Sequence, residues 1–167
     1  MDKNIFNEKI IIPKKHHETT RVALIAAAGL GPLGAFTTVA DVAAIAGVWT
    51  GCLVSIAYDE GIKLDKDAAL KICKSSLLGM GGYYAGCKTA TKFFHLIPGA
   101  GTLTAMGVSA LANILFTYRF VLTLCSIFRN KGKNFDADTL VENIVGMFHG
   151  NGILNDAKEI VRIYRNK

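Results

Sequence analysis

Apolar and charged residues are segregated along the chain into long blocks. In the first apolar block, from Val22 to Tyr58, the only charged residue is Asp41. In the second, from Ser75 to Phe128, only three residues are charged: Lys88, Lys92 and Arg119. Nothing alternates with a period of two for long enough to form a strand. The pattern therefore predicts an all-α chain.

The charged stretch between the two blocks contains an amphipathic helix pattern in "DKDAALKICKSSLL", residues 65–78. Asp65 stands where an N-cap residue accepts hydrogen bonds from the first helical turn. One helical face carries four small or apolar residues: Ala69, Ile72, Cys73 and Leu77. Lysines occupy other positions: Lys66, Lys71 and Lys74. We therefore expect a helix that buries one face.

Two shorter amphipathic helices are expected near the C-terminus, separated by "GNG" at 150–152. The first is lined by apolar residues: Leu140, Val141, Ile144, Val145 and Phe148. The second is lined in the same way: Ile153, Leu154, Ala157, Ile160, Val161 and Tyr164. We therefore divide the chain into an arm (1–13), a central domain (14–131) and these two helices (132–167).

The central domain contains an internal similarity. Residues 30–46, "LGPLGAFTTVADVAAIA", align without gaps on 96–112, "LIPGAGTLTAMGVSALA", with six identical pairs. The alignment predicts two repeated apolar helical hairpins, although the shared abundance of alanine inflates the count. The first joins helices at about 14–30 and 34–58, and the second joins helices at about 66–96 and 102–129. The turns contain glycine and proline: Gly31, Pro32 and Gly34 in one, Pro98, Gly99 and Gly101 in the other.

Composition narrows the class of protein. Apolar residues make up 51% of the chain and charged residues 19%, against roughly 25% charged in ordinary soluble domains. The net charge of +6 favours an anionic partner. The basic end "KEIVRIYRNK" has the period of an amphipathic helix, which favours lipid headgroups or packing on its own domain over nucleic acid. Four separated cysteines and no secretory signal indicate reduced thiols facing the cytosol.

Three phrases resemble the YcjF-like family, a bacterial GTPase-associated domain of unknown function: "GLGPLGAFTTVADVAAIAGV", "AYDEGIKLDKDAALKI" and "IPGAGTLTAMGVSALANILFTY". The matching positions are Pro32, Asp41, Tyr58, Gly61, Pro98, Gly99, Gly101, Thr117 and Tyr118. The resemblance covers residues 20–130 and departs at Arg119, where the family has a small residue. It implies membrane association and a link to GTPases, but no established chemistry, and this chain carries no GTPase domain of its own.

The distribution of charge also favours a membrane. The helices at 34–58 and 102–129 are long enough for a hydrocarbon core of roughly 30 Å. Both turns lack charge, whereas the opposite helix ends are strongly basic, which places those ends on the cytoplasmic side. We therefore expect two hairpins that dip into the bilayer from the cytoplasm. The alternative is a cytoplasmic protein that buries the same faces in a soluble oligomer.

Four charges oppose insertion into the bilayer: Asp41, Lys88, Lys92 and Arg119. A charge at mid-bilayer costs about 2.5–3.5 kcal/mol on insertion scales. Asp41 stands near the start of its helix, where the dipole favours an anion. It would offset part of that cost by pairing with Arg119 or with one of the two lysines.

Small residues recur at a spacing of four, which allows close helix packing in lipid. Gly47 and Gly51 form one pair, extended by Ala43, and Gly82 and Gly86 form another. Seventeen glycines produce some such pairs by composition alone. We nevertheless expect these residues to mediate helix packing and assembly into a homo-oligomer.

No motif predicts catalysis, a cofactor or a metal. "GGYYAGCKT" at 81–89 approaches a phosphate-binding loop, but Cys87 intervenes before the lysine. His16 and His17 precede Glu18 without further ligands at useful spacing, so we expect a solvated helix start. The sequence predicts a non-enzymatic membrane module that self-assembles alongside a GTPase, or alternatively a soluble scaffold that oligomerises through its hairpins.

Overall fold

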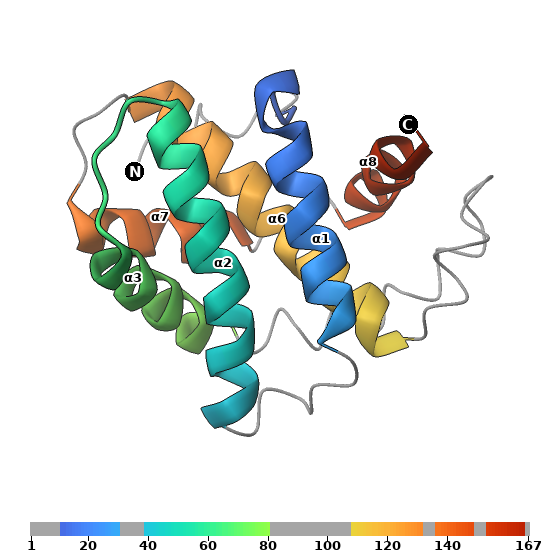
Figure 1. Cartoon of the computed structure of the whole chain (residues 1–167), viewed down its shortest axis with the longest axis horizontal. Helices are drawn as coiled ribbons and strands as arrows, with labels where there is room; N and C mark the ends of the chain where they lie inside the picture. Colours follow the sequence, from blue (N-terminus) through green and yellow to red (C-terminus); the bar gives the residue numbers. More distant parts are fainter. Residues whose placement is uncertain (1–10, 31–38, 81–107, 132–135, 149–152, 166–167) are drawn as a thin grey trace.

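The computed structural model describes residues 11–30, 39–80, 108–131, 136–148 and 153–165. Within these residues the chain forms six α-helices and no strand, which confirms the all-α fold (Figure 1). A short 3-10 turn precedes them, and the elements in chain order are η2 (Lys14–His16), α1 (His17–Gly29), α2 (Val39–Asp59), α3 (Lys66–Gly79), α6 (Val108–Lys131), α7 (Ala137–Phe148) and α8 (Ile153–Arg165).

Helix α6 forms the centre of the molecule. Every residue from 110 to 128 is buried, because α1, α2, α7 and α8 all pack against this helix. Figure 1 shows α1 and α2 lying across one side of it. A helix that is apolar around its whole circumference must be covered on all sides, either by protein or by lipid. Here it is buried within the protein, and α1, α2, α7 and α8 contribute to that cover.

The packing of α2 on α6 is built around the only tryptophan in the chain. Trp49 is fully buried, and its ring stacks on Phe120 with centroids 3.9 Å apart. Its indole N–H donates a hydrogen bond to the Thr117 hydroxyl at 3.1 Å, so burial leaves no polar atom of the ring unsatisfied. Phe116 packs against the same ring at 4.9 Å.

Helix α3 begins where its sequence pattern predicts, but it ends at Gly79, so the expectation of one helix over about 66–96 is wrong. The Asp65 carboxylate accepts hydrogen bonds from the backbone N–H groups of Asp67 and Ala68, both at 2.9 Å. This N-cap satisfies two donors that the first turn of a helix leaves free. The predicted inner face is buried, at Ala69, Ile72, Cys73 and Leu77.

The two C-terminal helices pack on the same core. Helix α7 contacts α3 and α6, and α8 contacts α6 and α1. Their expected inner faces are buried at Leu140 and Ile144 in α7, and at Ala157, Ile160 and Val161 in α8. All of these residues belong to one hydrophobic cluster with α6. The proposed boundary between 131 and 132 stays a prediction.

Two finer expectations are not confirmed. The turns of the predicted hairpins lie outside the described residues, so the hairpin repeat stays a prediction. Among the described helices, only α6, over Ala110–Arg129, is long and apolar enough to cross a membrane. The described apolar part of α2, Ala43–Asp59, is shorter, although α2 itself begins at Val39.

Candidate functional site

The small-residue stripe predicted on α2 lies on the molecular surface. Ala43, Gly47 and Gly51 are all exposed. A methyl group added at either glycine would have no heavy atom within 4 Å. These glycines therefore do not bring α2 close to another described helix. They leave a flat strip of backbone facing outward.

Open grooves lie on both sides of this strip. One, of about 470 Å³, runs between α1 and α2 past Val22, Ala26 and Val48. The other, of about 670 Å³, runs between α2 and α3. Gly47 and Gly51 line both grooves, so the strip forms their shared border.

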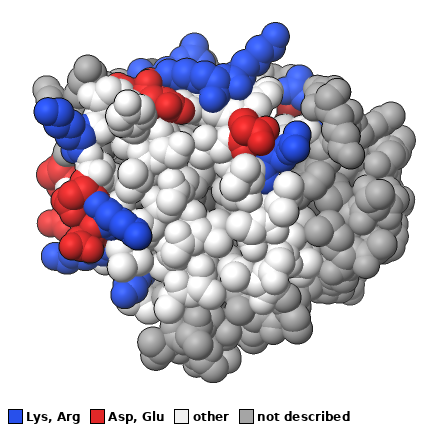
Figure 2. Space-filling view, in the orientation of Figure 1, with Lys and Arg blue, Asp and Glu red and all other residues white. Residues whose placement is uncertain are grey.

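The outer face of α1 extends this surface. Val22 is 57% exposed and Ile25 51% exposed, although both are branched apolar residues. Figure 2 shows a broad uncharged area over α1 and α2, with charged side chains along its upper and left edges. The sequence explains this, because α1 carries no charged residue after Arg21 and α2 none between Asp41 and Asp59. The two helices together present an uncharged outer surface, which we call the α1–α2 face.

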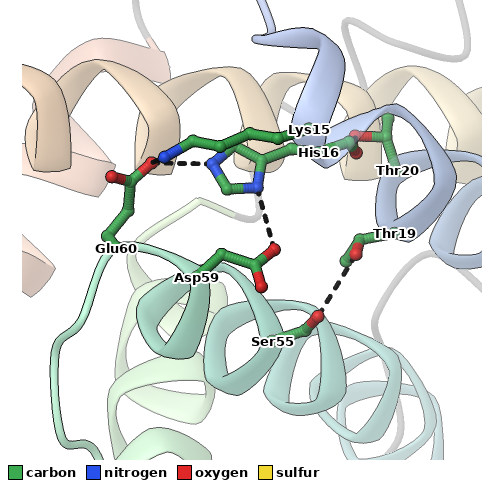
Figure 3. Close-up of polar contacts among 7 residues, drawn as sticks. All are labelled: Lys15, His16, Thr19, Thr20, Ser55, Asp59 and Glu60. Atoms are coloured by element: carbon green, nitrogen blue, oxygen red, sulfur yellow. Dashed lines mark hydrogen bonds and ion pairs between the residues drawn. The ribbon is translucent and has the colours of Figure 1, made fainter.

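Charges gather where α1 begins and α2 ends, around His16 (Figure 3). The His16 side chain is fully buried, with Nε2 2.7 Å from Oε1 of Glu60 and Nδ1 3.3 Å from Oδ2 of Asp59. Lys15 Nζ also lies 2.7 Å from the same Glu60 oxygen. The hydrogen bond from Lys15 lowers the pKa of Glu60, and the contact with His16 acts in the same direction, against partial burial.

The expectation of a solvated helix start is wrong for His16. The η2 turn directs this ring inward onto the C-terminal end of α2, where two carboxylates face its two nitrogens. Its backbone carbonyl accepts a hydrogen bond from Thr20 at 2.6 Å, and Thr19 contacts Ser55 of α2 at 3.2 Å. The cluster thus fastens the charged ends of α1 and α2 together.

Arg119 has a partner that the sequence did not suggest. Its Nη2 lies 2.6 Å from Oδ2 of Asp156 on α8, and both side chains are buried. Burial raises the pKa of Asp156 to about 6, although the Arg119 charge opposes the shift. Arg119 was one of three candidate partners for Asp41, with Lys88 and Lys92; the side chain of Asp41 lies outside the described part of the chain. In the sequence, Asp156 stands out only as an acidic residue on a helix face that is otherwise apolar.

The described cysteines lie in surroundings that make their thiols unreactive. Cys52, Cys73 and Cys125 are free and buried. Burial raises the pKa of Cys73 and of Cys125 to about 12, and that of Cys52 further still. Because the thiolate is the reactive form, these thiols act as small apolar fillers.

The remaining predicted site residues lie outside the described part of the chain: Gly31, Pro32, Gly34, Gly82, Gly86, Lys88, Lys92, Pro98, Gly99 and Gly101. Their assignments to turns, packing or buried charge stay predictions. Within the described part, no three His, Cys, Asp or Glu side chains are placed to share a metal ion.

No family model matches the chain, and neither a curated protein nor a solved structure matches it. The resemblance to the YcjF-like family therefore stays a prediction, carried by the residues quoted above.

Proposed function

We propose that this protein is a non-enzymatic helical module that associates with a membrane through its α1–α2 face and self-assembles there. The observation that carries the proposal is the separation of charge along these two helices. Charged groups cluster where α1 begins and α2 ends, and the rest of the face is uncharged with Val22 and Ile25 exposed. An exposed apolar surface of this kind is typical of an interaction site.

The energetics favour shallow attachment with help from other contacts. Burying one exposed aliphatic side chain contributes about 2 kcal/mol, so Val22 and Ile25 together provide affinity in the millimolar range. Basic groups near an anionic leaflet add about 1 kcal/mol each. The net charge of +6 supports a membrane with anionic lipid as the partner.

Self-assembly is proposed through the exposed strip at Ala43, Gly47 and Gly51. Small residues at this spacing let two helix backbones approach closely. Within the described chain nothing occupies that space. A second copy would therefore approach α2 without displacing any described side chain.

A non-enzymatic role is supported by the way in which the ionisable side chains are paired. Both ring nitrogens of His16 face carboxylates of α2, and Arg119 faces Asp156. Within the described part of the chain, these groups connect helices. The link to a GTPase is supported by the family resemblance alone. Copurification of a GTP-hydrolysing protein with the tagged chain would test it.

Co-sedimentation with vesicles tests the membrane proposal. Replacing both Val22 and Ile25 by Asn should reduce the bound fraction at least tenfold, because each change removes apolar contact worth about 2 kcal/mol. Leu78→Asn is the matched control, because Leu78 is 77% exposed on α3, away from this face. Equal binding by the unmodified chain, the double variant and the control would refute the assignment of the face.

The soluble scaffold is the second candidate, and the burial of α6 favours it. This long apolar helix is already buried inside the protein, without lipid. In that case the chain would form an oligomer in detergent-free buffer and leave the membrane pellet in carbonate washes. Retention in the pellet through carbonate and high salt would exclude it.

A further inference from the structure

The groove between α2 and α3 differs from its neighbour in its charge. Gly47, Gly51, Val54 and Leu70 form its apolar lining, which we call the floor. The groove between α1 and α2 has an acidic residue, Glu18, at its rim. Among the described residues, no acidic side chain lines the groove beside α3.

Two lysines stand at the rim of this groove. Lys66 and Lys74 both line it, and both are exposed. They are eight residues apart on α3, about 12 Å along the helix axis, on the same face. Within the described part of the chain, neither lysine forms an ion pair. Their long, flexible side chains are therefore free to converge on one anionic group.

The other polar group in the groove is already satisfied. The Thr50 hydroxyl donates a hydrogen bond to the Ala46 carbonyl at 2.6 Å, within its own helix. The groove therefore offers an apolar floor and two cationic groups. Its volume of about 670 Å³ falls within the range of sites that hold a small molecule.

We propose that this groove binds one anionic phospholipid, with an acyl chain over Gly47 and Gly51 and the headgroup phosphate between Lys66 and Lys74. The proposal rests on the membrane association proposed above, and it names the lipid class that the surface selects. Charge complementarity identifies the partner, because a lone phosphate would leave the apolar floor uncovered, and a zwitterionic lipid would bring its own cation close to the two lysines. The missing glycine side chains provide the space for the chain.

Vesicle binding tests the lipid class. The unmodified chain should bind vesicles of equal parts phosphatidylcholine and phosphatidylglycerol at least tenfold more strongly than vesicles of phosphatidylcholine alone. Changing Lys66 and Lys74 together to Gln should remove most of that preference. Changing Lys71 and Lys158 to Gln is the matched control, because both are exposed, neither lines the groove, and the net charge falls equally. Equal losses in the two variants would mean general surface attraction and would overturn the proposal.

A second measurement separates this inference from the membrane proposal. Short-chain phosphatidylglycerol below its micelle concentration should bind in a saturable manner, and Gly51→Leu should abolish binding. The added side chain would occupy the floor, and its Cβ would have no heavy atom within 4 Å. If inorganic phosphate bound with the same affinity as the lipid, the site would be a simple anion site. That result would contradict the role of the floor.

The remaining outcomes are distinct. Binding of monomeric lipid without vesicle binding would refute the membrane proposal and keep the groove. Vesicle binding without saturable binding of monomeric lipid would refute the lipid site in the groove and keep the membrane proposal. Loss of self-association in Gly51→Leu, without any lipid binding by the unmodified chain, would assign the groove to a second copy of the protein.

Discussion

At the scale of single residues, the buried ion pair between Arg119 and Asp156 illustrates how burial and attraction compete. Arg119 Nη2 lies 2.6 Å from Asp156 Oδ2, and this contact is the one partner given for that oxygen among the described residues. Removing two charges from water costs several kcal/mol per ion, which a single contact does not recover. The raised pKa of Asp156, about 6, follows from this imbalance.

We expect Asp156 to make stability fall as pH rises. Its pKa is higher in the folded chain, about 6, than its ordinary value of 3.8. The favourable contribution of the protonated acid is therefore complete below 3.8 and is lost as pH rises through about 6. Relative to Asp156→Asn, the unmodified chain should lose stability between these values in chemical denaturation. A constant difference across that range would contradict the raised pKa.

The same pair predicts a result from a double substitution. Arg119→Met alone or Asp156→Leu alone leaves one buried charge without its partner and should cost about 3–5 kcal/mol. Both changes together should give a protein about as stable as the unmodified chain, or more stable. Denaturation midpoints of all four proteins measure this. Additive losses in the double variant would show that the pair stabilises the fold.

Glu60 should behave in the opposite way to Asp156. The bond from Lys15 and the contact with His16 lower its pKa below the ordinary value of 4.5. Its stabilising contribution is therefore present above 4.5 and is lost as pH falls through the lower folded value. Glu60→Gln should be less stable than the unmodified chain at neutral pH, and the difference should shrink in acid. An undiminished difference at the acid end would contradict this linkage.

At the scale of elements, two glycines in neighbouring helices have opposite surroundings. Gly47 faces open space on α2, whereas a methyl group at Gly79 of α3 would lie 2.9 Å from Cγ2 of Val145 on α7. The glycine that permits close packing in the described core is thus Gly79, which the spacing pattern did not select. The pattern selected glycines that face outward.

Alanine at these two positions should therefore have opposite effects. Gly47→Ala should stabilise the chain by about 0.5–1 kcal/mol, because alanine restricts the unfolded helix segment and meets no neighbour. Gly79→Ala should destabilise it by about 1–3 kcal/mol through overpacking. Adding Val145→Ala should recover part of that loss, with a coupling measurable in a double-mutant cycle. Stabilisation by both alanines would show that α3 and α7 do not pack this closely.

At the scale of the whole molecule, α6 packs against α1, α2, α7 and α8, and α3 packs against α2 and α7. One hydrophobic cluster extends from Ile12 to Ile163. Such a core predicts a single cooperative unit. A separate C-terminal unit would instead unfold in a transition of its own.

Trp49 provides a direct measurement of that cooperativity. Its stacking on Phe120 makes its fluorescence a reporter of the contact between α2 and α6. Unfolding followed by this fluorescence and by far-UV circular dichroism should coincide. Ile160→Ala in α8 should shift both midpoints by the same amount, with a loss of about 2–5 kcal/mol. Two separate transitions would support the boundary at 131 and 132.

The local sequence determined the helices and their inner faces. The N-cap at Asp65 and the buried face of α3 could be predicted because helical periodicity and capping depend on residues three or four apart. The inner faces of α7 and α8 followed for the same reason. The absence of charge along α1 and α2 was also visible in the sequence, and it became a surface once the two helices were placed side by side.

Only the tertiary structure decided which groups meet and which remain exposed. His16 and Glu60 are 44 residues apart, and Arg119 and Asp156 lie on different helices, so no local pattern could pair them. The spacing of Gly47 and Gly51 showed that a helix could approach, but not whether one of the described helices does. The reason is physical, because a small side chain permits close contact but does not select a partner. The packing of α1 and α3 on either side of α2 left the outer surface of Gly47 and Gly51 open.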